Sequence, residues 1–135
     1  YVFEPIEKLI YRCKKNLKDV QRCELIGKGL WNTSTVLKFV SDEYNSKIVT
    51  ANDSNNTASI PVTTLDEELK GERVTFIKMD IEGSELMALK GAENIIRSQK
   101  PKLALSIYHK PEDLWEILML LLEYNPKYKF YIRHY

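Results

Sequence analysis

The sequence has little cysteine, no long apolar run and almost no net charge. Two cysteines, Cys13 and Cys23, are too few for a disulfide framework or a zinc site, and we expect them to be buried free thiols. The longest apolar stretch, residues 117–122, is far shorter than the roughly 20 residues of a membrane-spanning helix. The 20 basic and 19 acidic residues give no basic excess for nucleic acid. We therefore expect a cytoplasmic protein with no nucleic-acid or membrane partner.

What is present suits one soluble domain of 135 residues. Hydrophobic residues make up 44% of the chain and charged residues 29%, which provides both a core and an ordinary surface. The first residue is Tyr1 rather than methionine. We expect from this that residues 1–135 form a domain truncated at its N-terminus.

The spacing of apolar residues predicts strands that alternate with helices. The nearly continuous apolar run at 74–79 is typical of a strand covered on both faces. We expect Ser84 to cap the following helix, with Glu85 in its first turn near the helix dipole, and Gly91 to divide that helix in two. The expected elements are strands at 1–3, 20–26, 34–40, 74–79, 102–108 and 128–135, helices at 6–17, from Ser84 onward and at 111–122, and a long loop at 41–59. This order favours an α/β fold with a mostly parallel sheet flanked by helices.

Polar residues follow three of the expected strands. Ligands of open parallel sheets bind beyond the carboxyl ends of the strands, so these positions are candidates for a site. Glu4 could bind the two hydroxyls of a ribose, or it could only favour the helix N-terminus electrostatically. Both interpretations stay open on spacing alone.

Asp80 and Glu82 lie two residues apart in the turn after the 74–79 strand, where Gly83 permits a tight bend. They could hold a divalent cation, orient a substrate or face a sulfonium charge, or one of them could only cap backbone N–H groups. His109 ends the 102–108 strand and could act as a general base toward a hydroxyl, because an unperturbed histidine titrates near neutral pH. A purely structural histidine is the alternative. Asp80, Glu82 and His109 are too scattered in sequence to predict a metal site, so we expect no metal.

Several segments together resemble the FkbM methyltransferase family. The most specific is 76–85, Phe-Ile-Lys-Met-Asp-Ile-Glu-Gly-Ser-Glu, followed by Leu-Lys-Gly-Ala at 89–92. Further matching segments lie at 3–5, 63–66, 100–102, 106–110, 112–117 and 131–134. The resemblance covers nearly the whole chain. It implies a class I, Rossmann-like methyltransferase domain that uses S-adenosylmethionine.

The resemblance also implies roles for individual residues. Glu4 would bind the ribose hydroxyls of the cofactor, and Gly27 and Lys28 would lie near its adenine. Asp80 and Glu82 would line the cleft between cofactor and acceptor. Family acceptors tend to be hydroxyls of sugars or natural products, so O-methylation of a small molecule or saccharide is expected. His109 is the leading candidate for the base that deprotonates the acceptor, and Asp80 is the second.

One part of the family pattern is missing from this sequence. The Gly-rich turn after the first strand, which approaches the methionine part of the cofactor, has no counterpart here, and neither does the seventh strand. In the family fold the first strand lies between the second and the fourth, so the strands at 1–3 and 74–79 would each have an unpaired edge. Either the domain is incomplete or its halves close into a smaller sheet. A non-catalytic binding or scaffold remnant of the same fold is therefore the alternative function, and another nucleotide-binding α/β enzyme is a third.

Overall fold

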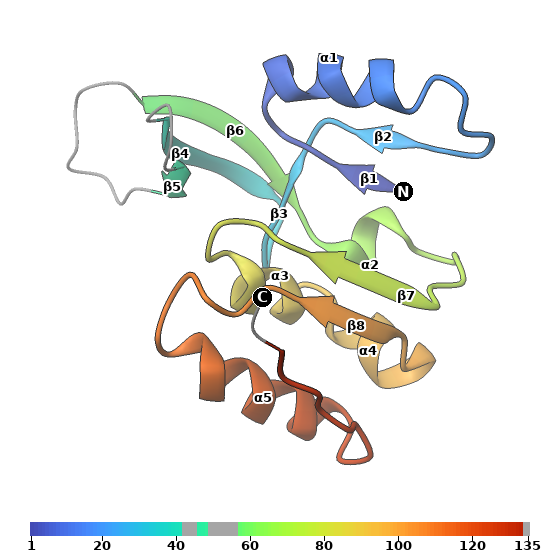
Figure 1. Ribbon diagram of the computed structural model, residues 1–135, viewed down its shortest axis with the longest axis vertical. Coiled ribbons are helices and arrows are strands. Elements are labelled where there is room, and N and C mark those ends of the chain that lie inside the picture. The colour runs from blue at the N-terminus through green and yellow to red at the C-terminus, as the bar shows by residue number, and fades with distance from the viewer. Residues whose placement is uncertain (42–45, 49–56, 134–135) are drawn as a thin grey trace.

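The computed structural model describes residues 1–41, 46–48 and 57–133, and statements below that something is absent refer to these residues. It is an α/β structure whose strands and helices alternate over most of the chain (Figure 1). The strands are β1 (Val2–Phe3), β2 (Leu25–Ile26), β3 (Gly29–Leu30), β4 (Thr35–Ser41), β5 (Ser46–Ile48), β6 (Thr57–Thr63), β7 (Phe76–Met79) and β8 (Lys102–Leu105). The helices are α1 (Glu7–Asn16), α2 (Leu65–Glu68), α3 (Glu85–Lys90), α4 (Glu93–Gln99) and α5 (Asp113–Tyr124).

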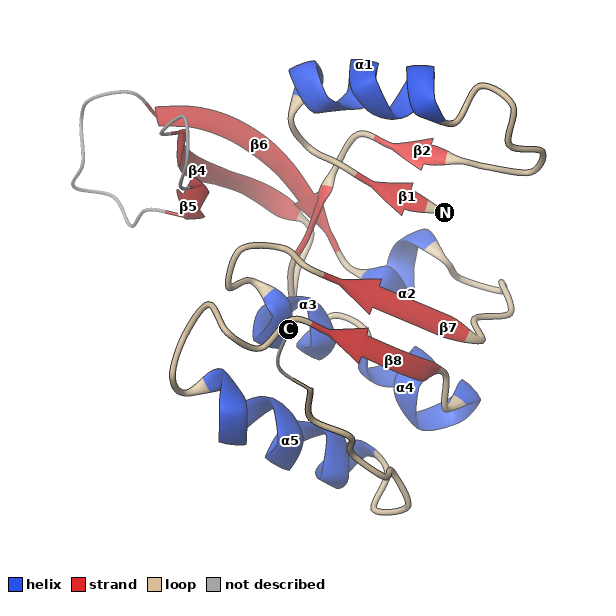
Figure 2. Cartoon of the chain, viewed as in Figure 1, coloured by secondary structure: helices blue, strands red, loops and turns tan. Residues whose placement is uncertain are grey.

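Two parallel pairs of strands form the part of the fold that positions the candidate site. β1 pairs with β2, and β7 pairs with β8 so that Met79 lies opposite Leu105. Figure 2 shows all four strands running in the same direction across the molecule, with α1 beside β1–β2 and α5 beside β7–β8. No described strand pairs with β1 on its β7 side, or with β7 on its β1 side. The two halves therefore do not close into a smaller sheet.

A third sheet has the strand order β3-β6-β4-β5 and projects from these pairs. β3 runs parallel to β6, whereas β4 runs antiparallel to both β5 and β6. β4 confirms the strand expected at 34–40. The loop expected at 41–59 is interrupted by β5 and ends where β6 begins, because these strands pair with β4; residues 42–45 and 49–56 lie outside the described residues.

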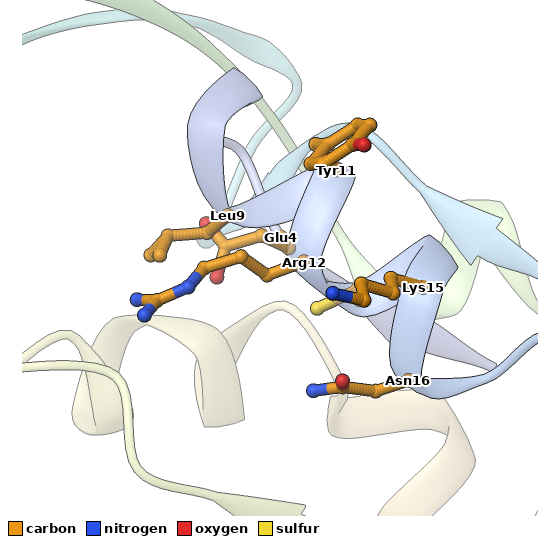
Figure 3. A pocket seen from close by; sticks show the side chains of 7 residues that line it. Glu4, Leu9, Tyr11, Arg12, Lys15 and Asn16 are labelled. Atoms are coloured by element: carbon orange, nitrogen blue, oxygen red, sulfur yellow. The ribbon is translucent and has the colours of Figure 1, made fainter.

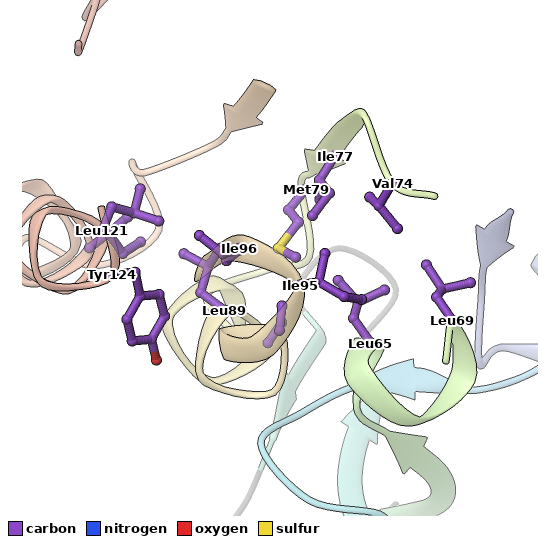
Figure 4. Packing of buried hydrophobic residues seen from close by; sticks show 13 residues of the cluster. Leu65, Leu69, Val74, Ile77, Met79, Leu89, Ile95, Ile96, Leu121 and Tyr124 are labelled. Carbon is purple, nitrogen blue, oxygen red and sulfur yellow. The ribbon is translucent and has the colours of Figure 1, made fainter. Parts of the chain in front are cut away.

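The main core lies between the β7–β8 pair and helices α3, α4 and α5 (Figure 4). Ile77 and Met79 of β7 are buried in it, together with Leu89 and Ile96 from the helices. The opposite face of β7 is open, and Phe76 is 58% exposed. The expectation that this strand is covered on both faces is therefore wrong for the described residues, because they place no helix over that face.

Other expected elements are shorter in the structure or absent. The strand expected at 20–26 is reduced to β2, since only Leu25 and Ile26 lie opposite β1, and Val20 is half exposed. β8 ends at Leu105 rather than at residue 108. Residues 128–133 form no strand; the Tyr128 hydroxyl donates a hydrogen bond to the Pro101 carbonyl and holds this segment without a backbone ladder. Cys13 and Cys23 are free but only half-buried.

Gly91 does divide the predicted helix, since α3 ends at Lys90 and α4 begins at Glu93. Its φ of −78° needs no glycine. The reason for glycine is space, because a Cβ at this position would lie 2.0 Å from the carbonyl oxygen of Trp31.

Replacing Asp66 with alanine should lower the free energy of unfolding by about 2 kcal/mol. Its two carboxylate oxygens accept hydrogen bonds from the N–H groups of Asn94 and Ile95, both at 2.9 Å, at the N-terminus of α4. Urea unfolding measures the effect, with Asp19→Ala as the control because the Asp19 side chain is 87% exposed. An Asp66→Ala variant as stable as the wild type would show that α4 does not need this cap.

Candidate functional site

A tight turn connects β7 to α3 and carries two of the predicted site residues. The Ser84 N–H donates to the Ile81 carbonyl at 3.3 Å, and the two central residues, Glu82 and Gly83, have φ values of 57° and 83°. Positive φ at both positions is the geometry of a type I′ turn. It costs a non-glycine residue such as Glu82 about 1–2 kcal/mol, so the packing around the turn must hold it in place.

Gly83 lets this turn pack against the segment that follows β8. A Cβ there would lie 3.1 Å from Lys110 Cε and 3.4 Å from His109 Cβ. The Lys110 ammonium donates a hydrogen bond to the Gly83 carbonyl, which fastens the two segments together. The turn after β7 and the residues after β8 therefore form one surface.

His109 lies among three carboxylates on that surface. Its Nε2 is 3.4 Å from Glu82 Oε2 and 3.7 Å from Asp80 Oδ1, and its Nδ1 is 3.4 Å from Glu85 Oε1. The histidine side chain is only 11% exposed. We refer to these four residues as the carboxylate–imidazole cluster. The structure thus brings His109 to Asp80 and Glu82, which lie 29 and 27 residues before it along the chain.

The sequence analysis missed Glu85 as a member of the cluster. This residue has no exposed surface, and its Oε1 accepts a hydrogen bond from the Ile81 N–H at 2.7 Å. Its Oε2 has no hydrogen-bond partner within residues 1–41, 46–48 and 57–133. Ser84 occupies the N-cap position of α3, but its side chain forms no capping hydrogen bond. A buried carboxylate is costly unless it is paired with a cation or hydrogen bonded, so His109 is the natural partner of Glu85.

Tyr108 covers one side of the cluster. Its hydroxyl donates a hydrogen bond to Asp80 Oδ1 at 3.2 Å, and its ring centroid is 4.2 Å from that of His109. Partial desolvation, the hydrogen bond to Asp80 and the nearby negative charges together raise the pKa of Tyr108. The phenol therefore stays protonated at neutral pH and can act there as a hydrogen-bond donor.

Glu4 lies apart from this cluster, at a hollow of about 570 Å³ beside α1. Figure 3 shows it next to Leu9 and Arg12, with Lys15 and Asn16 further along the helix. Glu4 Oε1 accepts a hydrogen bond from the Ile6 N–H at 2.8 Å, so the residue does help to start α1. Its position at the hollow also fits the expected contact with a ribose, and the volume lies in the range of small-molecule sites. The structure is compatible with both interpretations of Glu4.

Gly27 and Lys28 do not line this hollow. A Cβ on Gly27 would lie 3.3 Å from Ile10 Cδ1, so this glycine allows close packing of α1 on the segment after β2. The Lys28 ammonium donates a hydrogen bond to Glu68, and this bond lowers the pKa of the Glu68 carboxyl. The observed contacts of these two residues are structural, and their expected position near an adenine stays a prediction.

Known proteins give an independent comparison. The family model for the methyltransferase FkbM domain matches residues 1–128. The crystal structure of methyltransferase FkbM from Methylobacillus flagellatus KT is similar to this chain, with a TM-score of 0.69 and 31% sequence identity. None of the curated proteins compared with the chain matches it.

The similarity covers 94% of this chain but only 30% of the Methylobacillus protein, so the chain spans less than a third of that relative. Within residues 1–128 the family match includes Glu4 and all four residues of the carboxylate–imidazole cluster. The resemblance seen in the sequence is therefore confirmed, and this chain belongs to the methyltransferase FkbM domain family.

Proposed function

We propose that this chain acts in the S-adenosylmethionine-dependent O-methylation of a hydroxyl on a sugar or natural product, in the cytoplasm. The observation that carries the proposal is the position of His109. It lies almost buried beyond the ends of β7 and β8, with Nε2 facing Asp80 and Glu82. The cytoplasmic location is supported by the free thiols of Cys13 and Cys23. No helix in the described ranges combines the length and apolar character needed to cross a bilayer.

The residues of this chain fit the ribose end of S-adenosylmethionine. Glu4 at its hollow would hold the ribose hydroxyls, through the carboxylate oxygens that a diol needs as acceptors. When bound, the cofactor supplies an electrophilic methyl group on a sulfonium sulfur. Nothing in the sequence corresponds to the Gly-rich turn that approaches the methionine part, so the fit concerns the ribose end.

The chain's own contribution is to position the acceptor and remove its proton. His109 Nε2 is buried behind Asp80 and Glu82, so a hydroxyl reaches it only when these partly exposed side chains move aside. A hydroxyl there can transfer its proton to the imidazole, which general-base catalysis requires. The nearby carboxylates of Asp80, Glu82 and Glu85 then stabilise the imidazolium that forms. Tyr108, held by Asp80, is a hydrogen-bond donor at the edge of the same site and can orient the acceptor oxygen. Asp80 is the second candidate for the base.

The alternative is a binding or scaffold module that has kept the fold but does not transfer a methyl group. The structural contacts of Gly27 and Lys28, which do not line the hollow at Glu4, favour it. Such a module could use the hollow at Glu4 without using His109.

Transfer of a tritium-labelled methyl group from S-adenosylmethionine to a panel of sugars, polyketide alcohols, amines and thiols tests the proposed function. We expect label in a methyl ether of at least one hydroxyl compound. Label on nitrogen or sulfur acceptors alone would contradict the O-methylation. Binding of the cofactor without transfer to any acceptor would favour the non-catalytic module.

A further inference from the structure

The His109 ring has a different environment at each of its two nitrogens. Nδ1 faces Glu85, which is fully buried, whereas Nε2 faces Asp80 and Glu82, whose side chains are 41% and 59% exposed. One nitrogen is therefore directed toward a buried carboxylate, and the other is directed toward two partly exposed carboxylates. Both nitrogens are inaccessible to solvent and have no hydrogen-bond partner in the observed geometry.

We propose that Glu85 is a positioning residue that accepts a hydrogen bond from the Nδ1–H of His109 and so leaves Nε2 unprotonated toward the acceptor. A neutral imidazole carries its proton on one nitrogen only. Carboxylates face both nitrogens, at 3.4 Å on each side, but Glu85 is buried whereas Glu82 and Asp80 are partly exposed. Water screens the exposed carboxylates, so the buried one attracts the proton more strongly. The role in methyl transfer rests on the proposed function, but the location of the proton does not.

Glu85 is also held in place by a hydrogen bond from the backbone, which supports this assignment. Its Oε1 accepts the Ile81 N–H at 2.7 Å, and Ile81 belongs to the turn that carries Glu82. Glu85 therefore connects the turn after β7 to the imidazole after β8. A shift of about half an ångström would shorten the 3.4 Å separation of Nδ1 and Oε1 to hydrogen-bond length. Catalytic hydrogen bonds often tighten in this way when a substrate binds.

A divalent cation is the competing occupant of this cluster. Asp80, Glu85 and His109 each offer a ligand atom, and these atoms lie within 4.8 Å of one another. However, the ring nitrogen that faces Glu85 is not the one that faces Asp80. An ion held by one ring nitrogen would leave the other nitrogen–carboxylate contact unused, whereas a proton on Nδ1 makes direct use of the contact with Glu85. We therefore assign the proton, and a bound cation is an outcome of the test below.

Nitrogen-15 NMR of the histidine rings tests the assignment without requiring activity. In the 135-residue chain at a pH where His109 is neutral, we expect Nδ1 to show the shift of a protonated nitrogen and Nε2 that of an unprotonated one. Glu85→Gln keeps an oxygen for the Ile81 N–H but removes the charge, so the Nδ1-protonated form should lose its preference. Glu116→Gln, an exposed carboxylate in the first turn of α5, should leave the spectrum unchanged.

Three results would overturn the assignment. The first is an Nε2-protonated His109 in the wild type, which can be seen even if Glu85→Gln does not fold. The second is an unchanged proton position in a folded Glu85→Gln variant. The third is selective broadening of the His109 signals by micromolar Mn²⁺, which would show an ion in place of the proton. In the methyl-transfer assay, Glu85→Gln should lower kcat by about 10²–10⁴-fold with little change in KM, because a misplaced imidazole proton disables a general base. Absence of methyl transfer by the wild type would refute the proposed function but leave the NMR result valid.

Discussion

Replacing Gly91 with alanine should destabilise the protein by about 3 kcal/mol or more, the upper range for overpacking a core. Helix propensity predicts the opposite, because alanine is favoured over glycine by about 1 kcal/mol inside a helix. The close packing around Gly91 in the structure favours destabilisation over stabilisation. A Cβ would lie 2.0 Å from the Trp31 carbonyl oxygen and 3.2 Å from Thr64 Cβ, and a backbone atom cannot rotate away as a side chain can. The strand β3 and the junction of α3 and α4 would have to separate.

Urea unfolding of Gly91→Ala and Gly71→Ala distinguishes two reasons why a position requires glycine. One is a lack of space for a Cβ, and the other is a positive φ. Gly71 has a φ of +88° and no atom within 4 Å of its Cβ position, so alanine there meets only backbone strain of about 1 kcal/mol. The larger loss at Gly91 would identify a steric requirement. A Gly91→Ala variant at least as stable as the wild type would show that the Trp31 carbonyl oxygen does not lie this close to residue 91.

Replacing His109 with glutamine should lower kcat for methyl transfer by about 10²–10⁴-fold, the usual contribution of a general base. Glutamine fills a similar space and can still hydrogen bond, but it cannot take up a proton at neutral pH. The KM for the acceptor should change much less, since the carboxylates and Tyr108 remain. The loss should be largest at neutral pH and smaller at alkaline pH, where hydroxide replaces the missing base.

Steady-state rates of His109→Gln and Glu116→Gln with the same acceptor measure this effect. Circular dichroism shows whether each variant is folded, which is needed because the His109 side chain is almost buried. Turnover of His109→Gln within threefold of the wild type would exclude His109 as the base. Asp80 would then be the remaining candidate, and Asp80→Asn would test it.

The parts of the fold that the sequence predicted well are those with a strong local period. Helix α5 follows the regular spacing of Ile117 and Leu121, both buried, and ends before Pro126. β7 and β8 are short apolar runs bounded by turn residues. The position of a strand end, in contrast, depends on its partner. Of the strand expected at 20–26, only β2 forms, because β1 offers only two residues for pairing.

Glu85 shows what local reasoning missed in the site. Glu85, Ala88, Leu89 and Ala92 recur at the spacing of one helix face, and all four are buried. An acidic residue on the apolar face of a helix is a sequence signal for a buried, functional carboxylate. The first-turn position of Glu85 by itself predicts only a favourable interaction with the helix dipole, which acts equally on exposed residues. The grouping of Asp80, Glu82 and His109 was predictable, because the carboxyl ends of adjacent parallel strands lie together.

The open face of β7 could not be predicted from its own residues. Its apolar sequence fits a strand covered on both sides, and Phe76 is large and hydrophobic. Whether a helix covers that face depends on segments elsewhere in the fold. Burial of a strand face is a property of the assembled layers, which the strand sequence alone does not contain.

Calorimetric titration of the 135-residue chain with S-adenosylmethionine and with adenosine tests the central claim most directly, because it asks whether this chain carries the ribose end of the cofactor site. Both ligands should bind with affinities within about threefold of each other, since adenosine lacks only the methionine part. Glu4→Gln should weaken the binding of both by roughly 10–100-fold, because it removes hydrogen bonds to a charged acceptor. A folded chain that binds neither ligand, or a Glu4→Gln variant that binds both as well as the wild type, would contradict the account.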